Sequence, residues 1–124
     1  RRGTPRESLE QALAALLAAG DVCAAAIREV ATIDLKQNEP GLAAFCRAHG
    51  WPLTVFSAQQ LQNAPGAFTS SDFVRRVTGV DNVCERAAVL AAGGKLYLQK
   101  QAGNGVTMAL ALAPFAPDWR WQDE

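Results

Sequence analysis

The spacing of apolar residues along the chain predicts alternating helices and strands. Leu9, Leu13 and Leu16 recur every three or four residues, which is the spacing of one buried helix face. Short apolar runs such as 53–56 have the length and composition of strands. In chain order, the pattern predicts a helix over 4–20, a strand over 27–33, a helix over 38–49, a strand over 53–56, a brief helix from 57, a helix from 70 or 71 to 78, a helix over 82–93, and strands over 95–100 and 106–112.

The predicted helices begin and end at residues that favour helix termini. Asn38 is expected to cap the helix that carries Pro40 in its first turn, and Gly20, Gly50 and Gly93 are expected to end helices. In a capping box, a short polar side chain and a residue three positions later satisfy each other's backbone N–H groups. Three pairs have this spacing: Thr4 and Glu7, Ser57 and Gln60, and Asn82 and Glu85.

Helices that alternate with strands and end in one hairpin are typical of the α/β class. Gly103, Asn104 and Gly105 are the residue types of a tight reversal, so the last two strands are expected to pair antiparallel. We therefore predict a three-layer α/β/α sandwich with a mixed sheet of about four or five strands. A further element, most simply a central strand, is expected ahead of the first helix. Residues 1–124 are expected to form one domain, with a core over 1–113 and a C-terminal tail over 114–124.

Composition and charge argue against several classes of function. Twelve basic and twelve acidic residues cancel, which argues against a general nucleic-acid binder. No apolar run approaches the roughly 20 residues that a membrane helix needs. The cysteines are three, far apart, and without the spacing of a disulfide framework or a zinc site. We therefore expect a cytoplasmic protein with no metal, cofactor, nucleic-acid or membrane partner.

A charged loop over 31–41 is the first candidate site. Asp34, Lys36 and Glu39 directly follow the predicted strand, and ligands of open α/β sheets bind where strands give way to helices. A second candidate is the turn that holds Arg1 and Thr4, because a helix start favours an anion. The alternative is a solvated loop whose internal ion pair contributes about 1 kcal/mol or less.

Five separate segments, in order, give the chain a resemblance to a known family. It resembles the CobE family, which is also the C-terminal domain of CbiG, in Arg1-Arg2-Gly3-Thr4-Pro5, in Ala31 to Leu42, in Phe56 to Leu61, in Gly79 to Ala92, and in Lys100-Gln101 with Gly105-Val106-Thr107. Both groups belong to cobalamin biosynthesis. The chain looks like the stand-alone, CobE-like form.

The resemblance implies a role in building the corrin ring from a precorrin. CbiG opens the lactone of a ring-contracted cobalt-precorrin and releases the extruded fragment, so a hydrolase-type step is one implied role. Asp34 or Glu39 could then act as general base, and Lys36 could stabilise the oxyanion. A precorrin carries acetate and propionate groups, which cationic side chains and helix starts bind. The expected contacts are Arg1, Arg2, Gly3, Thr4, Lys36, Ser71 and Lys100.

Two alternatives to an enzyme stay open. One is a non-catalytic precorrin carrier or a partner of a neighbouring cobalamin-pathway enzyme. The other is an unrelated small α/β ligand-binding module. A cleft lined by the expected basic residues supports a precorrin binder over the unrelated module. A carboxylate poised beside water in that cleft favours an enzyme over a carrier.

Overall fold

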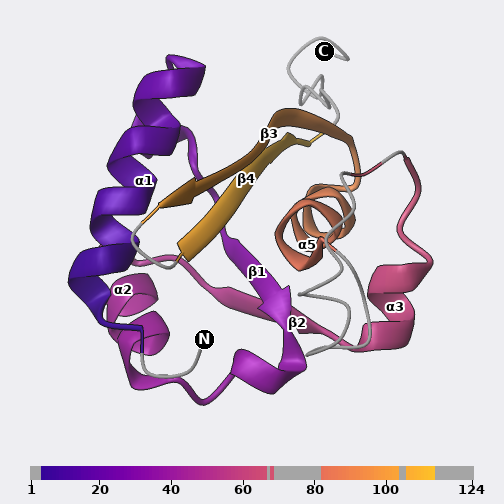
Figure 1. Cartoon of the computed structure of the whole chain (residues 1–124), viewed down its shortest axis with the longest axis horizontal. Coiled ribbons are helices and arrows are strands. Elements are labelled where there is room, and N and C mark those ends of the chain that lie inside the picture. Colours follow the sequence, from indigo (N-terminus) through magenta and orange to yellow (C-terminus); the bar gives the residue numbers. More distant parts are fainter. Residues whose placement is uncertain (1–3, 67, 69–81, 104–105, 114–124) are drawn as a thin grey trace, which may run out of the picture.

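The computed structural model describes residues 4–66, 68, 82–103 and 106–113, which form the helices and strands of an α/β fold (Figure 1). The predicted helix over 70–78, the turn at 104–105 and the tail over 114–124 lie outside these ranges. The elements are α1 (Arg6–Gly20), the 3₁₀ turn η1 (Ala24–Ala26), β1 (Val30–Ile33), the 3₁₀ turn η2 (Asp34–Lys36), α2 (Pro40–His49), β2 (Leu53–Phe56), α3 (Ala58–Gln62), α5 (Val83–Ala92), β3 (Lys95–Gly103) and β4 (Val106–Leu112).

The α/β class is confirmed, but the described strands form two sheets and not one. β1 and β2 pair in parallel from Val30 and Leu53 onward. β3 and β4 form the expected antiparallel hairpin, in which Gly103 faces Val106. The two pairs are not hydrogen-bonded to each other in the described part of the chain, because a cavity separates β1 from β4.

Helices flank the strands on two sides (Figure 1). On one side, α1 and α2 pack together and contact the hairpin through a buried cluster that includes Leu13, Phe45 and Val106. On the other side, α5 and α3 contact each other, and α5 covers β1 and β4. Ile33 and Leu61, both fully buried, form the centre of this second cluster. No helix within the described ranges has the length and hydropathy that crossing a membrane requires.

Local capping signals predicted some helix ends correctly and others wrongly. The Ser57–Gln60 capping box is present, and α2 ends at Gly50, which has the left-handed φ of 73°. The two predictions for the starts of α1 and α2 are wrong. Pro5 and not Thr4 is the N-cap of α1, Glu39 and not Asn38 is that of α2, and neither makes a side-chain capping bond.

Tertiary packing explains why Thr4 does not cap α1. Thr4 is buried, with 8% of its surface exposed, where α1 begins beside α2. A Cβ atom on Gly41 would lie 2.0 Å from the Thr4 carbonyl oxygen, so the two backbones meet where a side chain is missing. The strand predicted over 27–33 is also shorter, because residues 24–26 turn and only Val30–Ile33 pair with β2.

Candidate functional site

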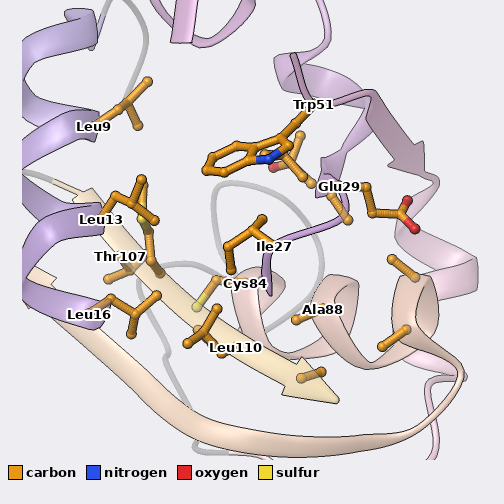
Figure 2. A pocket seen from close by; sticks show the side chains of 18 of the residues that line it. Leu9, Leu13, Leu16, Ile27, Glu29, Trp51, Cys84, Ala88, Thr107 and Leu110 are labelled. Atoms are coloured by element: carbon orange, nitrogen blue, oxygen red, sulfur yellow. The ribbon is translucent and has the colours of Figure 1, made fainter. Parts of the chain in front are cut away.

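A cavity of about 1070 Å³ lies between α1, α5, β1 and β4. Figure 2 shows Leu9, Leu13 and Leu16 reaching into it from α1, with Cys84 and Ala88 of α5 opposite. Most of its wall is therefore apolar. Trp51, which precedes β2, closes one side.

Such a space cannot stay empty. The cavity is partly open to solvent, so water and other molecules can enter it. Protein interiors are otherwise close-packed. The cavity is therefore a place for water, a ligand or further polypeptide.

Several polar residues lie at one end of this cavity, where three helices begin, whereas Arg28 and Glu29 line it just ahead of β1. Val106, at the start of β4, shares a core cluster with Leu9 of the first turn of α1 and Leu42 of the first turn of α2. Thr107 follows Val106, and it lines the cavity together with Cys84 in the first turn of α5. We call this end the polar end; its cavity-lining members are Thr4, Lys36, Glu39, Asn82, Lys100 and Thr107.

Successive turns hold Lys36 and Glu39 in place. The Gln37 N–H donates to the Asp34 carbonyl at 3.2 Å, and the Glu39 N–H donates to the Lys36 carbonyl at 3.2 Å. Glu39 then begins α2. The ammonium group of Lys36 has no ion-pair partner among the described residues, so its charge is available to an anion.

Glu85 fixes the opposite wall of the polar end. Its carboxylate is fully buried and accepts the Lys100 backbone N–H at 2.7 Å and the Asn82 side-chain amide at 2.5 Å. In return, the Asn82 side-chain oxygen accepts the Glu85 backbone N–H at 3.3 Å. The bond from the Glu85 backbone N–H to the Asn82 side chain is one half of the predicted capping box. The Glu85 carboxylate bonds to the Asn82 side-chain amide and to the Lys100 backbone N–H of β3. This carboxylate ties the start of α5 to Lys100.

Cys84 lines the cavity but is not an activated thiol. Burial, followed by the nearby Glu85 carboxylate, raises the pKa of Cys84 to about 11. The neutral thiol therefore dominates at physiological pH, and the thiolate is the form that reacts. The interpretation of Cys84 as a small packing residue fits this environment.

An aromatic and ionic group borders the cavity at Trp51. The Trp51 ring stacks on His49 with ring centroids 4.3 Å apart and planes 9° apart. His49 Nε2 lies 2.8 Å from a Glu10 carboxylate oxygen, and Arg6 lies 3.0 Å from the other oxygen. Burial acts to raise the Glu10 pKa, but the hydrogen bonds from His49 and Arg6 outweigh it, so the pKa is lowered.

The structure brings together part of the predicted site. Thr4, Lys36, Glu39 and Lys100 all line the cavity. Asp34 is exposed and is not among the lining residues. Arg1, Arg2, Gly3 and Ser71 lie outside the described residues.

Sequence reasoning missed the cavity residues Asn82 and Thr107. The sequence predicts Asn82 only as a helix cap. Its backbone is left-handed, with φ of 53° and ψ of 57°, and the only local indication of this is that asparagine tolerates such a conformation. Thr107 fits the alternation of apolar and polar residues in the predicted strand over 106–112, so nothing distinguishes it from an ordinary strand residue. Their common location depends on contacts between α5 and β4, which are distant in the sequence.

The chain is similar to two curated proteins that have the same name. Cobalt-precorrin-5A hydrolase of Priestia megaterium is 33% identical over 115 residues, which cover 92% of this chain and 30% of that protein. The protein of the same name from Salmonella typhimurium is 35% identical over 116 residues, covering 91% of this chain and 32% of that protein. The chain thus spans about a third of the length of these curated relatives.

A solved structure has the same fold. The crystal structure of CobE, a protein from the cobalamin biosynthetic pathway, matches with a TM-score of 0.80 and 28% identity over 88% of this chain and 82% of that chain. The family described as Cobalamin synthesis G C-terminus matches residues 1–111. The chain therefore belongs to the Cobalamin synthesis G C-terminus family and, with CobE, to cobalamin biosynthesis.

Proposed function

We propose that this chain binds a precorrin, a tetrapyrrole fringed with carboxylates, at the polar end of the cavity. One observation carries the proposal: the first turns of α1, α2 and α5 border this part of the cavity beside the two lysines Lys36 and Lys100. Helix starts and ammonium groups both favour carboxylates. The names of the two curated relatives supply the precorrin class.

Apolar surface beside these charges suits the macrocycle. Leu35, between Asp34 and Lys36, is 67% exposed, which is unusual for a leucine, and Trp51 borders the cavity. A flat ring system can cover such side chains while its carboxylates reach the lysines. Arg1, Arg2, Gly3, Thr4 and Ser71 remain predicted contacts within this proposal, and so does a cytoplasmic location.

The proposal includes a hydrolytic role for the loop that carries Lys36. Glu39 is the cavity-lining carboxylate on this side of the polar end, and we assign it as the base that activates water against a lactone. Lys36, three residues earlier, would stabilise the oxyanion. Asp34 is the second candidate base, at the exposed end of the same turn.

Binding can be tested with purified cobalt-precorrin-5A by isothermal titration calorimetry. Lys36→Ala and Lys100→Ala are each expected to weaken binding about tenfold, because each removes a charge-assisted contact of about 1.4 kcal/mol. Lys95→Ala is the matched control, since Lys95 is exposed on β3 and does not line the cavity. Equal affinities for all three variants would refute the assigned binding site.

Catalysis needs a separate measurement. Glu39→Gln is expected to retain binding and to abolish conversion of the bound precorrin, followed by absorbance and mass. Asp34→Asn is the parallel variant for the second candidate base. If the unsubstituted chain binds the precorrin and leaves its mass unchanged, the carrier function replaces the hydrolytic one.

The architecture that we propose beyond the described elements is the predicted three-layer sandwich, with one mixed sheet of about four or five strands between two helical layers. The helices that contact the strands from two sides support it. In this arrangement, the polar end lies where parallel strands give way to helices, which is the usual ligand crevice of such folds.

A further inference from the structure

Glu85 is a buried carboxylate directly behind the polar end of the cavity. It is fully buried, and it is not one of the described residues that line the cavity. Both residues that donate hydrogen bonds to its carboxylate, Asn82 and Lys100, do line the cavity. A ligand in the cavity therefore meets Asn82 and Lys100, and Glu85 can act on that ligand only through them.

The hydrogen bond from Lys100 to Glu85 coincides with a bulge in β3. Between its pairings with Leu110 and Met108, β3 has two residues, whereas β4 has only Ala109. Lys100 is one of these two residues, and its backbone N–H donates to the Glu85 carboxylate at 2.7 Å. A bulge bends its strand and redirects a side chain, and bulges are frequent beside active sites. The bulge thus sets the direction of the Lys100 side chain, and Glu85 holds the bulge.

The charge of Lys100 acts at the polar end. Burial raises the pKa of Cys84, the Glu85 carboxylate adds to this effect, and the Lys100 ammonium acts in the opposite direction. Cys84 reaches into the cavity from α5 (Figure 2), so the ammonium lies within electrostatic reach of the cavity wall. Lys100 makes no ion pair with any of the described residues, so its charge is available to an anion.

We propose that Glu85 is a positioning residue: it holds the bulge of β3 and thereby directs the Lys100 ammonium at a carboxylate of the ligand. The inference rests on the proposed precorrin site and adds to it the means by which Lys100 is held. A lysine side chain is long and flexible, so its ammonium occupies a defined place only if its backbone is fixed. Hydrogen bonds from residues behind the contact surface supply this support in binding sites.

The alternative is that Glu85 only stabilises the start of α5. The two roles differ in how Glu85 and Lys100 are coupled. If Glu85 acts on the ligand through the Lys100 ammonium, its effect on affinity disappears when that ammonium is removed. If Glu85 is purely structural, its replacement affects binding equally with and without the ammonium.

Isothermal titration calorimetry with cobalt-precorrin-5A distinguishes these roles. In the parent chain, Glu85→Gln is expected to weaken binding about fivefold, because it disrupts one supporting hydrogen bond. Lys100→Ala removes the ammonium but keeps the backbone N–H, and in this background Glu85→Gln should change affinity by less than about twofold. Added salt should weaken binding less steeply for Glu85→Gln than for the parent, because a charge contact is lost.

Val89→Ala is the matched control for a loss of stability. Val89 is buried in the same helix and does not line the cavity. Its truncation removes buried apolar contacts and leaves the bond between Glu85 and Lys100, so affinity and salt dependence should equal those of the parent. Circular dichroism confirms that each titrated variant is folded. If Glu85→Gln does not fold, deletion of Gln99 takes its place, because β3 then lacks the extra residue of the bulge.

Different results overturn different parts of the proposal. If Lys100→Ala binds as tightly as the parent, the proposed site fails and the role of Glu85 fails with it. If Lys100→Ala weakens binding and the variant of the bulge does not, the site stands and the role of Glu85 fails alone. The same holds if Glu85→Gln weakens binding equally with and without the Lys100 ammonium.

Discussion

Glu85 is expected to be among the most costly residues to replace, although it is a charged side chain. It is fully buried, and its two carboxylate oxygens accept separate donors, the Asn82 side-chain amide and the Lys100 backbone N–H. Glu85→Ala leaves both donors without this acceptor. Each buried orphan costs about 1–3 kcal/mol, so we expect a loss of about 3–5 kcal/mol in the free energy of unfolding.

Glu85→Gln gives a graded comparison. The amide keeps one acceptor oxygen, but its NH₂ group must face either the Asn82 amide or the Lys100 N–H, both of which are donors. A loss of about 2 kcal/mol is expected. Glu7→Ala, at an exposed position of α1, is the control and should stay within about 0.5 kcal/mol.

Urea unfolding followed by circular dichroism measures these differences. A domain of this size is stable by about 5–15 kcal/mol, so Glu85→Ala can still fold while its midpoint falls clearly. The reasoning would be refuted if Glu85→Ala unfolded within about 1 kcal/mol of the parent with an unchanged slope. That result would mean that water replaces the carboxylate at no net cost.

Three further predictions concern other parts of the structure. Gly41→Ala should lower stability by about 2 kcal/mol in thermal melts, because its Cβ would lie 2.0 Å from the Thr4 carbonyl; an unchanged melting temperature would contradict this contact. Iodoacetamide at pH 8 should modify the exposed Cys23 well before Cys84, because a pKa raised from 9.0 to about 11 lowers the Cys84 thiolate fraction about hundredfold; comparable rates would disprove the shift. The folded-state pKa of Glu10 is lowered below 4.5, so the stabilisation by its carboxylate is present above that pH and disappears as the pH falls through the folded-state pKa. Glu10→Gln should therefore make the free energy of unfolding fall less steeply at acidic pH. An unchanged pH dependence in this variant would contradict the assigned role of Glu10.

The sequence predicted those features that depend on neighbours along the chain. Ser57 and Gln60 form their capping box, and α2 ends at Gly50, because the interacting groups lie within one turn. The hairpin was predicted from its turn residues and alternating strands, and β3 pairs with β4. Local chemistry was sufficient at each of these positions.

Features that depend on distant contacts were predicted less well. Thr4 has the sequence of a helix cap, but the meeting of its backbone with Gly41 buries it between α1 and α2. Asn82 and Thr107 join the candidate site only because α5 packs on β4. The charged loop was found because Lys36 and Glu39 directly follow a strand, whereas the opposite wall has no comparable run of charges.

The stacked pair of Trp51 and His49 gives the protein an optical reporter. Indole emission depends on the polarity around the ring. Trp51 borders the cavity, and its stacking on His49 holds the ring in one orientation. The fluorescence of this side chain therefore records, without any attached dye, what fills the space between α1 and α5.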